Sequence, residues 1–168
     1  MRLVRTWAFM VFLGLLKTNS MGQNVVRYEK FEELQEVYTN GSPDTTYVVN
    51  FWATWCRPCV KELPYFESIH AAYKDSAVKV ILVSLDFPNT IDSGLVPFVK
   101  RKGLKAMVAV LKDGNANRWI DMVDTSWSGA LPGTLFVHGK YRRFYEKSYE
   151  TPEGLKTDLL KAIRNKEL

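Results

Sequence analysis

A run of apolar residues that leads directly into two cysteines constrains the fold more than any other feature of this chain. Residues 47–52 are typical of a buried strand, a short turn then carries Cys56, and Pro58 begins a long helical pattern. Proline suits the first turn of a helix, because a backbone N–H has no partner there. Cys56 and Cys59 are therefore expected to stand three residues apart at the start of a helix that follows a buried strand.

Two thiols at this spacing can close a disulfide with each other. Cys56 is placed where unpaired backbone N–H groups and the helix dipole favour a thiolate, which is the reactive form of cysteine. Arg57 adds a positive charge beside it, and Pro58 stiffens the turn that sets the separation of the sulfurs. We therefore predict a dithiol/disulfide exchange site in which Cys56 attacks. Cys59, one turn inside the helix, resolves the mixed disulfide.

Two other uses of a cysteine pair must be weighed. A zinc site needs additional ligands at short spacings, but His70 and His138 lie far apart and form no paired-histidine motif. We therefore expect no metal, and the exchange chemistry needs no organic cofactor. A purely structural disulfide is the second alternative, but so short a loop removes little entropy from the unfolded chain and would stabilise the fold only weakly.

Apolar patterns outline the rest of the chain. Residues 78–85 and 106–111 predict buried parallel strands, and residues 134–137 and 141–145 predict a β-hairpin. Thr151 is the expected N-cap of a C-terminal helix. The order βα-βα-βα-β(α)-ββα predicts an α/β fold with one sheet of mixed direction and helices on both faces, although periodicity alone leaves several doubly wound topologies open.

The sequence NFWATWCRPCVKELP, residues 50–64, resembles the active-site region of the thioredoxin-like superfamily. It is most similar to the TlpA/ResA-type exported thiol–disulfide oxidoreductases, and the resemblance covers residues 25–168. It implies a thioredoxin-like fold and an enzyme that reduces disulfides in client proteins. It also implies an upstream thiol electron donor, expected in the membrane. It does not imply a stable oligomer. A thioredoxin-fold binding or chaperone-like module without redox turnover is the competing interpretation.

The resemblance identifies three residues of a client-binding surface. Pro132 matches the cis-proline of thioredoxin-like proteins, which leaves the backbone of Leu131 open to an extended substrate segment. An ordinary trans-proline in a loop is the alternative. Trp55 is expected to shield the sulfurs and shape the docking surface, with burial in the core as its alternative.

Three further positions bear on proton transfer and on the client. Asn50 stands where cytosolic thioredoxins have a buried aspartate, so the proton acceptor for Cys59 must be another group. Glu62 matches a glutamate near the active site of ResA-type proteins, and it lies one helical turn beyond Cys59. A solvated surface glutamate is the alternative. Gly133 stands where many ResA-like cytochrome-maturation proteins have a glutamate, which weakens the case for a haem-apoprotein client.

Residues 1–22 are predicted to be a secretory signal peptide, because basic residues precede an apolar segment, residues 7–16, that is short for a bilayer span. Small residues at its end favour cleavage before Gln23, and an uncleaved membrane anchor is the alternative. Residues 23–168 then form one thioredoxin-like domain. Export, most simply to the periplasm, would place the dithiol where disulfides persist.

Charge and length agree with a single soluble domain. The chain has 168 residues, of which 46% are hydrophobic. The formal net charge of +5 owes three positive charges to the predicted leader, so the rest of the chain is close to neutral. A nucleic-acid partner is therefore not expected.

Overall fold

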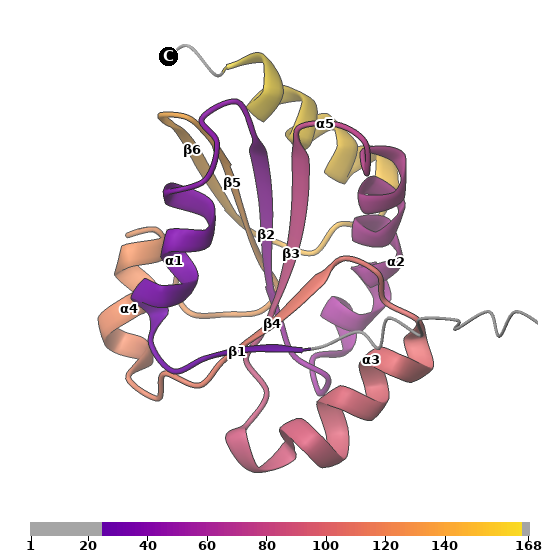
Figure 1. Cartoon of the computed structure of the whole chain (residues 1–168), viewed down its shortest axis with the longest axis vertical. Coiled ribbons are helices and arrows are strands. Elements are labelled where there is room, and N and C mark those ends of the chain that lie inside the picture. The colour runs from indigo at the N-terminus through magenta and orange to yellow at the C-terminus, as the bar shows by residue number, and fades with distance from the viewer. Residues whose placement is uncertain (1–24, 166–168) are drawn as a thin grey trace, which may run out of the picture.

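A six-stranded sheet of mixed direction forms the centre of the structure, a computed structural model that describes residues 25–165 (Figure 1). The strand order across the sheet is β1-β4-β3-β2-β5-β6. The first four strands in this order run parallel to one another, whereas β5 is antiparallel to β2 and to β6. The strands are β1 (Val26–Tyr28), β2 (Thr46–Trp52), β3 (Val78–Ser84), β4 (Met107–Leu111), β5 (Gly133–His138) and β6 (Tyr141–Glu146).

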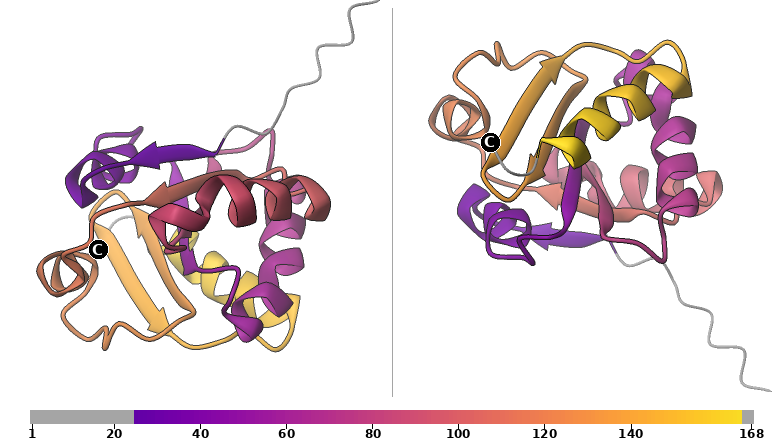
Figure 2. Two further views of the ribbon diagram at one scale, coloured as in Figure 1. Left: turned by 90° about the horizontal axis from the view of Figure 1, so that it is seen from below. Right: turned by 90° about the horizontal axis from the view of Figure 1, so that it is seen from above.

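Helices cover both faces of this sheet (Figures 1 and 2). On one face α2, α3 and α5 enclose a hydrophobic core, and on the other face α1 and α4 enclose a second. One 3₁₀ turn and one π-helical turn, over residues 88–95, lead into α3. The α-helices are α1 (Phe31–Thr39), α2 (Arg57–Ala72), α3 (Val96–Lys102), α4 (Ala116–Val123) and α5 (Pro152–Arg164).

The central strand β2 contributes to both cores, because successive side chains of a strand point to opposite faces. Val48 and Trp52 pack in the core under α2, whereas Val49 and Phe51 pack in the core under α1 and α4. Asn50 shares the face of Val48 and Trp52. A polar side chain is therefore buried between the sheet and α2, directly beneath the helix that carries the cysteines.

The elements predicted from the sequence are present. The hairpin formed by β5 and β6 is observed, and Thr151 caps α5, since its side chain accepts a hydrogen bond from Gly154 N at 3.3 Å. The predicted leader, residues 1–22, lies outside the described residues, together with its cleavage site and the anchor alternative. Within residues 25–165, no helix is long and apolar enough to cross a membrane.

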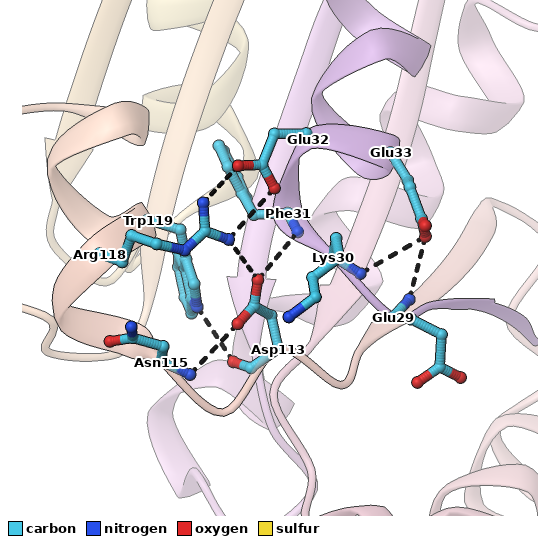
Figure 3. Close-up of polar contacts among 9 residues, drawn as sticks. All are labelled: Glu29, Lys30, Phe31, Glu32, Glu33, Asp113, Asn115, Arg118 and Trp119. Carbon is cyan, nitrogen blue, oxygen red and sulfur yellow. Dashed lines mark hydrogen bonds and ion pairs between the residues drawn. The ribbon is translucent and has the colours of Figure 1, made fainter.

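A polar cluster ties the start of α1 to the start of α4 (Figure 3). Asp113 is only 8% exposed, and its carboxylate accepts hydrogen bonds from Phe31 N at 3.3 Å and from Arg118 Nη2 at 2.6 Å. Arg118 also pairs with Glu32 of α1, and Trp119 Nε1 donates to the backbone oxygen of Asp113 at 3.1 Å. Asp113 thus satisfies donors from both helices that cover this face.

We expect Asp113→Asn to lower the free energy of unfolding at pH 7 by about 1–3 kcal/mol, because the buried Phe31 N–H and the partly buried Arg118 lose a charged acceptor. Burial raises the pKa of Asp113, but hydrogen bonds from Asn115, Arg118 and Phe31 outweigh burial and hold the pKa below its ordinary value. A lowered carboxyl pKa contributes stability that is lost as the pH falls through the folded-state value. The difference in unfolding free energy between wild type and Asp113→Asn, measured by urea unfolding, should therefore be smaller at acidic pH than at pH 7.

Lys61→Met is the control for this variant. It breaks an ion pair between Lys61 and Glu150 that is exposed on both sides, so the free energy of unfolding should stay close to that of wild type. Equal losses of unfolding free energy in the two variants would show that the Asp113 carboxylate does not stabilise the fold more than an exposed ion pair does.

Candidate active site

A disulfide joins Cys56 and Cys59 at the amino end of α2, with their Cα atoms 5.3 Å apart. Cys56 is the N-cap of α2, and Cys59 N donates a hydrogen bond to Cys56 Sγ at 3.3 Å. The same N–H group and the helix dipole would stabilise a thiolate on Cys56 after reduction. Pro58 lies in the first helical turn, as predicted. Within residues 25–165, no group of three or more His, Cys, Asp or Glu side chains is placed to hold a metal ion.

The two sulfurs differ in their access to solvent. Cys56 is 6% exposed, whereas Cys59 is fully buried. Cys56 lines an open hollow of about 480 Å³ whose lining is mainly apolar, and Arg57 is the charged residue among those that line it. The residues lining the hollow are Trp55, Cys56, Arg57, Pro58, Leu85, Gly129, Ala130 and Leu131.

The Leu131–Pro132 peptide bond is cis, as the resemblance implied. The bond lies immediately before β5, and the partly exposed Leu131 lines the same hollow as Cys56. In the described part of the chain, no backbone hydrogen bond outside the helices and strands involves Leu131. The peptide groups of Leu131 can therefore pair with an extended segment beside Cys56.

Trp55 does not belong to the core, because 58% of its surface is exposed. It stacks on Phe87, which is 61% exposed, with 6.3 Å between the ring centroids. Phe87 was not among the site residues predicted from the sequence. Its position shortly after β3 could have indicated it, because the carboxyl ends of parallel strands, and the loops that follow them, meet at one edge of a sheet.

Asp86 connects the two loops that carry this aromatic pair. Its buried carboxylate accepts hydrogen bonds from Thr54 N at 3.0 Å and from the Thr54 hydroxyl. Ser84 Oγ donates to the same carboxylate at 2.7 Å. The turn before Cys56 is thereby fixed to the end of β3, which holds Trp55 and Phe87 together.

Glu62 is fully buried, so the alternative of a solvated surface glutamate is wrong. Its Oε2 accepts hydrogen bonds from Tyr149 N at 2.7 Å and Ser148 Oγ at 3.4 Å, and its Oε1 accepts one from Asn50 Nδ2 at 3.3 Å. Burial raises the pKa of Glu62 to about 7, although these hydrogen bonds act in the opposite direction. The carboxyl can therefore take up or release a proton near neutral pH.

The packing around Gly133 leaves no room for a side chain. A Cβ atom at this position would lie 2.7 Å from Phe144 Cζ and 3.4 Å from Trp127 Cε2. The glutamate that many ResA-like cytochrome-maturation proteins have after the cis-proline therefore does not fit here unless Phe144 moves.

The AhpC/TSA family model matches residues 28–141 of the chain. The chain is 41% identical over 114 residues to a thiol-disulfide oxidoreductase ResA of Bacillus thuringiensis subsp. konkukian, and the match covers 67% of this chain and 61% of that protein. It is 51% identical over 90 residues to the ResA of Oceanobacillus iheyensis, covering 54% of this chain and 42% of that protein. The chain thus spans less than two thirds of the length of these relatives.

The structure is similar to that of a secreted Mycobacterium tuberculosis disulfide oxidoreductase homologous to E. coli DsbE. The TM-score is 0.54 at 17% sequence identity, and the match covers 70% of this chain and 82% of that chain. At this identity the similarity concerns the fold. The thioredoxin-like α/β fold that the sequence predicted is confirmed.

Glu62→Gln should make the stability of the fold less dependent on pH. Since the folded-state pKa of Glu62 is raised from 4.5 to about 7, its neutral form contributes stability at low pH that is lost as the pH rises through about 7. We expect wild type to lose about 3 kcal/mol of unfolding free energy from this group between pH 4 and pH 8, and Glu62→Gln to retain it. Urea unfolding of the oxidised protein at a series of pH values measures the difference.

Glu36→Gln is the control for Glu62→Gln, because Glu36 is an exposed carboxylate on α1, which lies on the opposite face of the sheet from Glu62. It should leave the pH dependence of the unfolding free energy unchanged. Parallel stability curves for wild type and Glu62→Gln would contradict a titrating carboxyl buried at position 62.

Proposed function

This chain belongs to the AhpC/TSA family, and from that premise we propose that it is a thiol–disulfide oxidoreductase that reduces disulfides in client proteins. One observation carries the proposal: Cys56, at the helix N-terminus, and Leu131, of the cis Leu131–Pro132 bond, line the same hollow. The relatives named ResA support the same activity. In this arrangement a reactive sulfur and an unpaired backbone segment can engage one client together.

The proposed cycle transfers two electrons from the dithiol to the client. The Cys56 thiolate attacks a client disulfide, so that a bond forms between Cys56 Sγ and one client sulfur while the other client sulfur leaves and takes up a proton. Cys59 then loses its proton and attacks Cys56 Sγ, which releases the second client sulfur as a thiol. The Cys56–Cys59 disulfide is left, and a thiol donor reduces it to the dithiol with two electrons and two protons.

Glu62 is the proposed acceptor of the proton that Cys59 loses. It lies one turn beyond Cys59 on α2, and its raised pKa suits proton exchange at neutral pH. In the disulfide form described here, its oxygens accept hydrogen bonds from Asn50, Ser148 and Tyr149. Reduction of the disulfide would leave a protonated Cys59 on the same helix, with Glu62 as a nearby base.

We propose that the protein works outside the cytoplasm, with a membrane-borne thiol donor. The predicted leader, residues 1–22, supports export, either as a cleaved signal peptide or as an anchor. The similar fold of a secreted disulfide oxidoreductase is consistent with it. Disulfides persist in such a compartment, so clients that need reduction would be present there.

The exposed aromatic pair of Trp55 and Phe87 is the proposed docking surface for these clients. Among residues 25–165, the large apolar side chains that are exposed are these two and Val26. Trp55 lines the hollow at Cys56 and Phe87 stacks on it, so an apolar client side chain could be covered there during exchange. The same surface would serve the second candidate function, a binding module without redox turnover.

Insulin reduction with dithiothreitol as donor separates the two candidate functions. We expect turnover by wild type, none by Cys56→Ser, and an accumulating mixed disulfide with Cys59→Ser, since the resolving thiol is then missing. In the reduced wild type, iodoacetamide should label Cys56 well before the buried Cys59, as determined by mass spectrometry. A folded wild type without turnover would favour the binding module, and preferential labelling of Cys59 would reverse the assigned roles.

Phe87→Ser should raise KM for a protein client about 2–10-fold, because an aromatic contact at the edge of the hollow is lost. Reduction of a small disulfide such as hydroxyethyl disulfide should proceed at the wild-type rate, since that substrate does not reach Phe87. Val26→Ser is the control, as it removes an exposed apolar side chain on β1 that does not line the hollow. A KM equal to that of wild type would remove Phe87 from the docking surface.

A further inference from the structure

The side-chain amide of Asn50 joins Glu62 to the segment that follows the cis-proline. Asn50 is fully buried in β2. Its Nδ2 lies 3.3 Å from Glu62 Oε1, 3.2 Å from Thr134 Oγ1 and 3.5 Å from the backbone oxygen of Gly133. An amide nitrogen has two N–H donors, so three acceptors compete for them.

The other half of this amide lacks a partner. Among the described residues, Asn50 Oδ1 is buried and accepts no hydrogen bond. A buried acceptor without a donor is costly, and such groups in a native protein call for a physical reason. Three acceptors therefore crowd the nitrogen of Asn50 while its oxygen accepts nothing, which is an arrangement that suits only one protonation state of its neighbours.

A change of protonation at Glu62 would give the unpaired Oδ1 of Asn50 a hydrogen-bond donor. A charged carboxylate only accepts hydrogen bonds, so Asn50 must then present Nδ2 to it. A neutral carboxyl has an O–H to donate, and Asn50 Oδ1 becomes its natural acceptor after a half-turn of the amide group. Thr134 can remain a partner in both states, because a hydroxyl group donates as well as accepts.

We propose that Asn50 is a positioning residue that holds the Glu62 carboxyl and relays its protonation state to Thr134 and Gly133, beside the cis Leu131–Pro132 bond. The inference rests on the proposed role of Glu62 in disulfide exchange. Its consequence is that proton uptake by Glu62 alters the hydrogen bonding of Gly133 and Thr134, the first residues of β5. These residues come shortly after Leu131, which lines the hollow at Cys56.

The proposal also accounts for an amide in place of a carboxylate at position 50. An aspartate there would put two carboxyl groups in one buried site, where they would share a proton and titrate as a pair. Asn50 instead contributes donors that favour the charged form of Glu62. A single carboxyl group, that of Glu62, then titrates at this site. The neutral amide of Asn50 changes its orientation with the protonation state of that group.

Other ionisable groups near Glu62 come from its own helix and from the segment after β6. On α2 the neighbour is Cys59, which is bonded to Cys56 in this structure. After β6, Glu150 acts on Glu62 through space and favours its neutral form. Tyr149 binds it through the backbone N–H, and the Tyr149 hydroxyl contacts Asp158 of α5 at 3.2 Å. Asp158 is itself paired with Lys147 and Lys161.

The relay can be measured by NMR on the full protein, oxidised and reduced, from pH 4 to pH 9. In wild type, the Glu62 carboxyl carbon, the Asn50 side-chain amide and the Thr134 amide should titrate with one shared midpoint. In Asn50→Leu, the Glu62 midpoint should rise by roughly 1–2 pH units, because a donor to the charged form is lost. The NMR signal of the Thr134 amide should then no longer change with the protonation of Glu62. The pH–rate profile of insulin reduction should shift by the same number of pH units as the Glu62 midpoint.

Two further variants sharpen the test. Asn50→Asp should replace the single titration by two steps. Ser148→Ala removes a donor to the opposite carboxyl oxygen, so the Thr134 amide should still follow Glu62 in that variant. Thr134 and Asn50 amides that do not titrate with Glu62 in wild type would overturn the relay, even if Asn50→Leu fails to fold. Coupled titrations in a protein that does not reduce insulin would support the relay while the proposed function fails.

Discussion

The antiparallel pairing of β2 with β5 is the constraint on which the candidate site depends. Antiparallel neighbours bring the end of one strand to the start of the other, and Phe51 near the end of β2 pairs with Gly133 at the start of β5. The turn that carries Cys56 and the loop that contains Pro132 must therefore emerge at one edge of the sheet. Helix α2 then begins with its N-terminus at this edge, so the backbone N–H groups point toward the sulfurs.

A polar layer runs through the otherwise apolar interior on the α2 side of the sheet. Asn50, Glu62 and Thr134 are fully buried there, in contact with the backbone of Tyr149. Burying such groups opposes folding unless they bond to one another, and here most of their hydrogen-bonding capacity is used internally. The large apolar cores on both faces of the sheet supply the stability that makes this layer tolerable.

Local sequence was enough to predict the dithiol, because the strand, the turn and the helix start are contiguous and each has its own signal. The cis bond at Pro132 required the family resemblance, since a proline in a loop is usually trans. The burial of Glu62 could not be predicted, because its partner Tyr149 lies 87 positions away in the chain. The place of Phe87 in the site was not predicted, for a similar reason. Its role depends on stacking on Trp55, which is a contact between the loops that follow two different strands.

The contact between Gly133 and Phe144 has a consequence for how this protein could acquire other specificities. A side chain at position 133 would collide with the Phe144 ring, which is itself packed against Trp127. An acidic residue beside the cis-proline therefore requires either that the Phe144 ring moves or that residue 144 becomes smaller, and a smaller residue leaves a cavity in the core. Packing thus couples positions 133 and 144, so a new side chain at position 133 lowers the stability of the core whichever way the collision is relieved.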